Sequence, residues 1–404
     1  MSDNIKSTRK VQTGRFRLLK GGKSSQKEED FFDYNLLAVI ILLTAFGLVM
    51  QYSVTAYSAQ VSHSSGAFLK QSAVALAGIV LLVLVSRLAD YHKLAAPALM
   101  AYVISIGLCV ITHYFGVEVN GARRWIRLAP GVQFQPAELV KLSVILLIPL
   151  MIVKMGRRFR GYKAPVTVAA PSIVAFLVIR IFTDNLSSAL IVLGITYVVI
   201  VVAHPHPKWL IVLFAALAGA AFVAFLVLKG QASAGGAMSE NFRLRRIFVW
   251  LDPENHQSDG GYQVMQGLYA IGSGGIFGKG LGNSAQKLGA LPEAENDMIF
   301  AIICEELGIV GAMIVLALFV YLLFRLFFIA INAPDLLGSL ISVGIFAHIA
   351  IQVILNIAVV LNVIPTTGIT LPFVSYGGTS LMFLMIEMGI ALNISGQITD
   401  RKKK

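Results

Sequence analysis

Long runs of apolar residues constrain the fold of this chain more than any other feature. A helix needs about 20 apolar residues to cross the hydrocarbon core of a membrane. Of the 404 residues, 57% are hydrophobic and only 13% are charged, which is typical of membrane proteins. Ten stretches have a suitable length: 36–52, 68–85, 94–112, 137–153, 165–182, 186–203, 209–228, 298–325, 336–361 and 374–394. We therefore expect an all-α polytopic membrane protein with about ten transmembrane helices.

Basic residues predict the orientation of these helices. Segment 154–163, between the fourth and fifth spans, is rich in Lys and Arg, and both ends of the chain are basic. Such loops remain in the cytoplasm, and an even number of spans puts both termini there. We expect basic cytoplasmic tails at 1–33 and 396–404, and a membrane domain at 34–395. The tails are expected to contact anionic membrane lipids, and no nucleic acid.

Two segments on the expected outer side are also basic, against the usual topology signal. They are residues 120–135 and the large extracytoplasmic loop 229–297 between the seventh and eighth spans. One interpretation is that translocation tolerates some charge, because the bias is statistical. The other is that these side chains bind an anion. The basic residues concerned are Arg123, Arg124, Arg127, Arg243, Arg245, Arg246, Lys279 and Lys287.

Glu138 and Lys141 lie in the first turns of the fourth span, directly after Pro136. Pro suits the first turn of a helix, and residues three apart share a helix face. An unpaired charge near the membrane boundary is costly. We expect the two side chains to form a structural ion pair or to line a polar cavity.

Loop 229–297 is far too long for a simple connection, which indicates a functional or a disordered segment. Its glycines, between Gly260 and Gly282, permit tight turns and close approach to a ligand. No Walker pattern accompanies them. The loop ends at Asp297, where water meets lipid, and a partly desolvated carboxylate there is a stronger base than one in bulk water. The alternative is an acid that only marks the membrane boundary.

A polar stripe and a broken helix follow near the end of the chain. His348, Gln352 and Asn356 are each four residues apart and share one helix face, where polar side chains usually join helices. Segment 365–380 is dense in Pro and Gly, which at membrane depth indicates backbone that lines protein or water. All these features lie toward the outer ends of their spans. A site that forms bonds there needs an activated substrate carried through the membrane, such as a lipid pyrophosphate.

Four motifs together resemble the signatures of the FtsW/RodA/SpoVE, or SEDS, family. They are residues 120–125 (NGARRW), 135–141 (QPAELVK), 291–300 (LPEAENDMIF) and 365–380. The resemblance covers the chain after about Phe31, and it is greater to the division and sporulation members than to the elongation member. Asn296 and Met298 stand where the common pattern around the family's catalytic aspartate has Thr and Phe.

The resemblance implies a peptidoglycan glycosyltransferase in a bacterial cytoplasmic membrane. It would polymerise lipid II and release undecaprenyl pyrophosphate, for septal wall synthesis at cell division. The resemblance also implies a class B penicillin-binding protein (FtsI-like) and other divisome proteins as partners, and Asp297 as the catalytic residue. A departing pyrophosphate needs charge stabilisation by Arg or Lys, or by a divalent cation such as Mg or Mn. The candidate substrate-binding residues are Arg123, Arg124, Lys141, Glu138, Arg243, Lys279, Ser375, Gly377 and Gly378.

Two other functions fit the same residues. Intramembrane charges and broken helices also occur in transporters, so the chain could flip lipid II across the membrane. It could also be a scaffold that activates a class B penicillin-binding protein. Strand assembly from lipid II in detergent separates a transferase from a flippase, because a flippase performs no chemistry.

Overall fold

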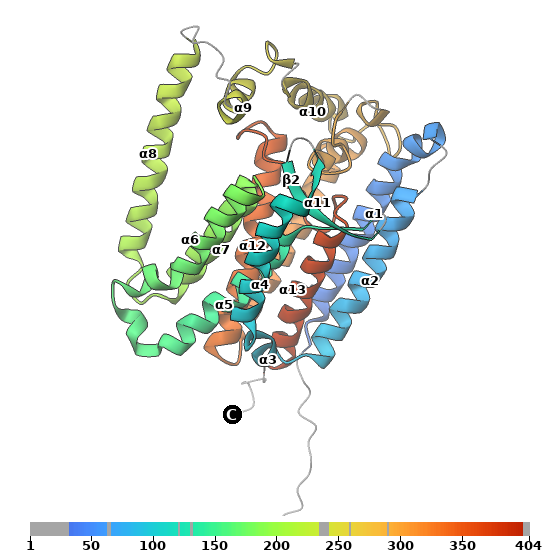
Figure 1. Ribbon diagram of the computed structural model, residues 1–404. Coiled ribbons are helices and arrows are strands. Elements are labelled where there is room, and N and C mark those ends of the chain that lie inside the picture. The colour runs from blue at the N-terminus through green and yellow to red at the C-terminus, as the bar shows by residue number, and fades with distance from the viewer. Residues whose placement is uncertain are drawn as a thin grey trace, which may run out of the picture.

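The protein is a bundle of long helices capped at one end by shorter elements, as the computed structural model shows (Figure 1). The structure describes residues 32–62, 66–119, 122–129, 132–233, 242–257, 260–288 and 291–398. The basic tails expected at the two ends lie mostly outside these ranges. The long helices are α1 (Tyr34–Ser62), α2 (Gly66–Leu88), α4 (Ala98–Phe115), α5 (Pro136–Met155), α6 (Ala164–Phe182), α7 (Leu186–Ala203), α8 (Lys208–Ser233), α11 (Ile299–Asn332), α12 (Leu336–Val360) and α13 (Thr379–Gly396).

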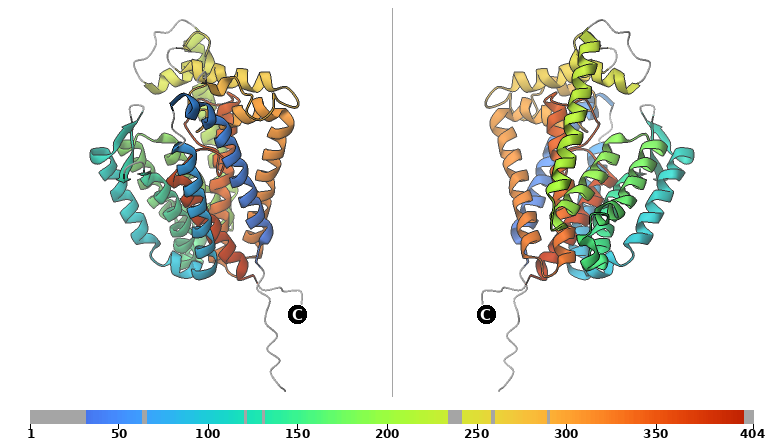
Figure 2. Two further views of the ribbon diagram at one scale, coloured as in Figure 1. Left: turned by 90° about the vertical axis from the view of Figure 1, so that its right-hand side faces the viewer. Right: turned by 90° about the vertical axis from the view of Figure 1, so that its left-hand side faces the viewer.

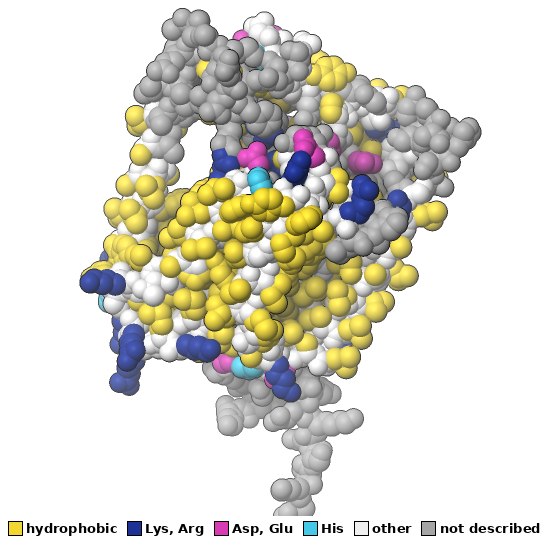
Figure 3. Space-filling view, in the orientation of Figure 1, with side chains coloured by type: hydrophobic (Ala, Val, Ile, Leu, Met, Phe, Trp, Pro, Cys, Tyr) yellow, Lys and Arg dark blue, Asp and Glu magenta, His cyan; other side chains and the backbone are white. Residues whose placement is uncertain are grey.

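These ten helices match the ten expected spans. Within the described ranges, nine are long and apolar enough to cross a membrane. The tenth, α8, is a 26-residue helix at the seventh expected span, and its apolar described part is Lys208–Ala220. Figure 3 shows a broad band of hydrophobic side chains across the visible face of the bundle, with mostly Lys and Arg at one end and charges of both signs near the other. The predicted all-α polytopic membrane fold is confirmed.

Two helices, α4 and α13, begin later than expected, for local reasons. The third span was expected from 94, but α3 (Tyr91–Ala95) is separate and α4 begins after Pro97, which caps it. The tenth span was expected from 374, but α13 begins only at Thr379. Gly378 precedes it with φ +43°, a backbone conformation that glycine adopts readily. Hydropathy averaged over a span does not register such breaks, because most residues of each span are apolar.

The centre of the bundle is formed by α12, which packs on α7, α5 and α11. On one side α1 packs on α11 and α2 on α13; on the other, α4 lies against α5 and α6 (Figure 2). The described ends of the chain meet, because the backbone N–H of Asp33 donates to Ser395 Oγ over 3.3 Å. The chain therefore leaves and re-enters the bundle at one end, opposite the shorter capping elements.

The capping elements form most of the end opposite the described chain ends, here called the capped end. They are α9 (Phe242–Leu251), α10 (Gly261–Gly274) and η3 (Gln286–Leu288) in the large loop, and a small antiparallel sheet of β1 (Val117–Val119), β2 (Ala122–Ala129) and β3 (Val132–Phe134). At the other end lies η1 (Gly156–Arg160), which holds part of the basic segment between α5 and α6. The segment between α12 and α13 is not helical and lies beneath the cap.

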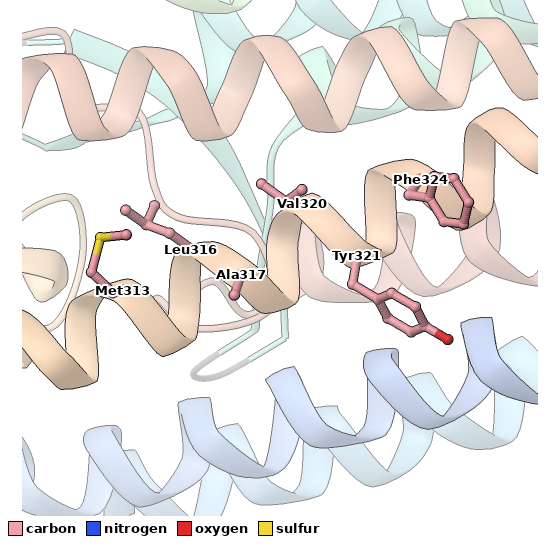
Figure 4. A pocket seen from close by; sticks show the side chains of 6 residues that line it. All are labelled: Met313, Leu316, Ala317, Val320, Tyr321 and Phe324. Carbon is pink, nitrogen blue, oxygen red and sulfur yellow. The ribbon is translucent and has the colours of Figure 1, made fainter.

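An apolar surface groove lies along α11 and carries no candidate chemistry. It has a volume of about 560 Å³ and is lined by Met313, Leu316, Ala317, Val320, Tyr321 and Phe324. Figure 4 shows these side chains on α11, with α1 beside it. The lining is apolar apart from the Tyr321 hydroxyl, so we interpret the groove as membrane-facing surface and not as the functional site.

Candidate functional site

Asp297 lies at the capped end of the bundle, two residues before α11 begins. It is only 6% exposed. Its backbone carbonyl accepts a hydrogen bond of 2.8 Å from the side-chain amide of Asn356, on α12. Its carboxylate is contacted by Gln263 Nε2 on α10, at a long 3.5 Å, and by its own backbone N–H. The carboxylate is therefore buried between three elements, and its described hydrogen bonds leave it able to accept a proton.

The surroundings of Asp297 tune its acidity. Burial and the nearby charge of Glu293 raise the pKa of the Asp297 carboxyl from 3.8 to about 7, while Arg246 on α9 opposes this rise. A general base works best when its pKa lies near the working pH. The acid that sequence reasoning selected for its position is thus also suited to base catalysis at neutral pH.

The non-helical residues just before Asp297 are joined by hydrogen bonds to the broken segment between α12 and α13. Gln51 on α1 donates from Nε2 to the carbonyl of Glu295 over 2.9 Å and to that of Val374 over 3.2 Å. The backbone N–H of Tyr376 donates to the same Glu295 carbonyl over 2.8 Å. Two non-helical segments, far apart in sequence, therefore form one wall of the site.

Two guanidinium groups lie near this wall. Arg246 donates to the carbonyl of Thr366 over 3.2 Å, and Arg124 on β2 donates to the carbonyl of Asp184 over 3.1 Å. Burial lowers the pKa of both, and the charge of Arg246 lowers the pKa of Arg124 further. The charge of Asp184 stabilises both cations. Two partly buried cations that repel each other next to a buried carboxylate form a favourable site for an anionic substrate group.

The neighbouring arginines of the first motif point to different places. Side chains of consecutive residues in a strand face opposite sides. Arg124 faces Arg246, whereas Arg123 is half exposed, with its Nε 3.4 Å from Glu118 Oε2 and its Nη1 donating to the carbonyl of His113 over 3.3 Å. No described contact joins Arg123 to Asp297. The sequence motif alone treats the two arginines alike, and only the strand separates them.

Glu138 and Lys141 form the expected ion pair. Lys141 Nζ lies 2.8 Å from Glu138 Oε2, and both side chains are buried. The pair lies on α5, which packs on α12 and α13. The described contacts do not join it to Asp297, so a role in binding substrate stays a prediction.

Lys279, also expected to bind substrate, is held by α11. Its ammonium group lies 2.7 Å from Glu305 Oε1, while Lys287 pairs with the next acid, Glu306, over 2.8 Å. The loop packs against α11 at a kink inside the helix, at Gly308, where φ is +68° and the backbone N–H of Ile309 donates to the carbonyl of Gly275 over 3.0 Å. These pairs fix the glycine-rich loop to the helix that follows Asp297, which leaves Lys279 a structural role in addition to the predicted one.

The remaining predicted residues shape the backbone or lie outside the described part. Ser375 Oγ accepts from the backbone N–H of Leu371 over 2.7 Å and so closes a turn of the broken segment. Gly377 and Gly378 lie at the start of α13, where a Cβ on Gly377 would lie 2.5 Å from Ser380 Oγ. Arg243 lies in α9, but its side chain is outside the described residues.

Three residues of the site were not selected from sequence. Arg246 was one of several outer basic residues without a distinguishing signal, and Gln263 lay in a loop not expected to form α10. Asp184 follows α6 as part of a short connection. Nothing in its sequence surroundings could have placed it beside Arg124 and Arg246. Across the described ranges, no group of three or more His, Cys, Asp or Glu side chains could hold a metal.

Comparison with known proteins identifies the family of this chain. A model described as a cell cycle protein family, FtsW/RodA/SpoVE, matches residues 33–400. The chain belongs to the FtsW/RodA/SpoVE family. The resemblance carried by the four sequence motifs is thereby confirmed.

Curated relatives match nearly the whole length of this family member. Stage V sporulation protein E of Bacillus subtilis (strain 168) is 36% identical over 366 residues, covering 90% of this chain and 96% of that protein. Probable peptidoglycan glycosyltransferase FtsW of Trichlorobacter lovleyi is 35% identical over 369 residues, covering 90% and 93%. Sporulation and division members of the FtsW/RodA/SpoVE family are thus among its relatives.

Solved structures of the family share the fold. A chain of a peptidoglycan synthase complex, in a study of how polymerization and crosslinking are coordinated, matches with a TM-score of 0.71 and 28% identity, covering 90% of this chain and 97% of that one. Rod shape determining protein RodA of Thermus thermophilus matches with a TM-score of 0.64 and 26% identity, covering 91% and 98%.

Proposed function

We propose that this chain is a peptidoglycan glycosyltransferase that polymerises lipid II, with Asp297 as the general base. The observation that supports this most is a buried carboxylate of raised pKa beside two partly buried guanidinium groups. A base and a neighbouring anion site are what transfer of a sugar from a lipid pyrophosphate requires. Relatives over nine-tenths of the chain carry the name peptidoglycan glycosyltransferase.

The reaction follows from these groups. A sugar hydroxyl of one substrate attacks the anomeric carbon of the other, and its proton passes to the Asp297 carboxylate as the new glycosidic bond forms. The bond between that carbon and the pyrophosphate oxygen breaks, and undecaprenyl pyrophosphate leaves with both electrons. Arg124 and Arg246 stabilise the charge that develops on the leaving group. A divalent cation such as Mg or Mn, bound to the pyrophosphate oxygens, would supply further positive charge.

The setting of the reaction is part of the proposal. The capped end of the bundle faces outward and both termini face the cytoplasm, because η1 and the tails are basic. The membrane domain spans 34–395 between the tails 1–33 and 396–404. A class B penicillin-binding protein and other divisome proteins are its partners at the septum, and the match to a peptidoglycan synthase complex supports such a partner.

Strand assembly in detergent tests this function against its two rivals. The purified chain, together with a class B penicillin-binding protein whose crosslinking site is blocked, is given lipid II without vesicles. We expect glycan strands and released undecaprenyl pyrophosphate. A flippase forms no strands, because it performs no chemistry. A scaffold would form strands only through its partner, so they would persist with Asp297→Asn.

A further inference from the structure

The polar stripe on α12 does more than join two helices. Asn356, Gln352 and His348 share one buried face of the helix. His348 pairs with Glu387 on α13 over 2.8 Å, as a helix-joining residue would. The other two reach backbone instead: Gln352 donates to the carbonyl of Thr370 over 3.0 Å, and Asn356 donates to two carbonyls.

Asn356 uses its amide nitrogen to bridge the two non-helical segments of the site. Its Nδ2 lies 2.8 Å from the carbonyl oxygen of Asp297 and 2.7 Å from that of Ile369. An amide nitrogen has two hydrogens, so both are used. Among the described hydrogen bonds, no other donor reaches either carbonyl. A buried carbonyl without a donor is costly, so the bridge also stabilises both segments.

The bridge matters for the base because the Asp297 carboxylate has little else to orient it. Its described hydrogen bonds are the 3.5 Å contact with Gln263 and one from its own backbone N–H. The direction of the carboxylate therefore depends on where the backbone of residue 297 is held. The second carbonyl lies three residues from Thr366, whose carbonyl binds Arg246. One buried amide thus connects the base with the segment that anchors a cation of the anion site.

We propose that Asn356 is a positioning residue that fixes the Asp297 carboxylate relative to the Arg246 guanidinium. It acts through backbone carbonyls and touches no substrate. The proposal rests on the proposed function, because it assigns Asn356 to the same reaction. Misplacing a reacting group by about 1 Å can cost about 100-fold in rate.

Asn356→Leu, which is similar in size and has no donor, tests this role. In the strand-assembly reaction we expect kcat to fall by about 10- to 100-fold, with KM changed by less than about threefold. The pH at which the rate is half-maximal should also move down. A loosened Asp297 gains water, and burial is the main cause of its raised pKa.

Gln352→Leu is the matched control. It removes one buried amide from the same face of α12, one turn away, and releases only the carbonyl of Thr370. We expect this variant to keep the pH midpoint of the parent. If Asn356→Leu does not fold, Asn356→Ser, which retains one donor, replaces it and should show the same shift to a smaller extent.

The outcomes separate the inference from the proposed function. A parent chain that makes no strands overturns the proposed function and, with it, the positioning role of Asn356. A parent that makes strands, beside a folded Asn356→Leu variant with unchanged kcat, overturns the positioning role alone. So does an equal loss of rate in Asn356→Leu and Gln352→Leu without a shift in pH midpoint, because that result indicates a merely structural stripe.

Discussion

Asp297→Asn lowers the rate of strand formation by about 10²- to 10⁴-fold, the range that a general base contributes. Asparagine has the shape of aspartate but accepts no proton at neutral pH. The variant keeps the two contacts of residue 297, since Gln263 can still donate to the side-chain oxygen and Asn356 to the backbone carbonyl. We therefore expect unchanged folding and partner binding, measured by thermal unfolding and by co-purification.

Glu293→Gln is the matched control for this result. Glu293 lies four residues before Asp297 and receives a hydrogen bond from Asn296. It affects the pKa of the Asp297 carboxyl but does not replace it as a base. We expect the control to keep its rate within a few-fold at pH 8. Full activity of folded Asp297→Asn would exclude Asp297 as the base.

Arg246→Ala should lower kcat by about 10²-fold or more, because the loss of one group that stabilises developing negative charge has an effect of this size. The guanidinium is partly buried, so water compensates poorly for its loss. Arg246→Lys keeps the charge but not the forked donors and should recover part of the rate. The measurement is steady-state strand assembly with each purified variant.

Arg123→Ala is the control for Arg246. Arg123 carries the same charge at the same end of the bundle but faces Glu118 and the carbonyl of His113. We expect a change of less than about threefold, as for an exposed ion pair of small energetic value. A larger loss with Arg123→Ala than with Arg246→Ala would contradict this assignment and place the anion site on the face of β2 that carries Arg123.

The helices could be predicted from sequence because each follows from a local run of apolar residues. Asp297 could be singled out from sequence as well, because it lies in an acidic cluster at the start of a span; its role stays a prediction. The partners of Asp297 could not be predicted in this way. Arg246 and Gln263 lie on α9 and α10, in a loop whose helices hydropathy did not reveal.

The basic residues show the same limit more sharply. Arg123 and Arg124 are adjacent in sequence, and only the alternation of a strand decides which of them meets Arg246. Lys279 has the charge of a substrate ligand, yet Glu305 on α11 holds it. Charge and position suggest candidates, whereas long-range packing determines which of them reach the site.

The dependence of rate on pH tests the central claim, that Asp297 is a base tuned by its surroundings. A base acts when it is deprotonated, so the rate of strand formation should rise with pH through a midpoint at about 7. Glu293→Gln should move the midpoint down, because the charge of Glu293 raises the pKa of Asp297. Arg246→Ala should move it up, because Arg246 lowers that pKa. A rate that is flat between about pH 5 and 9, or a midpoint that neither variant moves, would contradict this account.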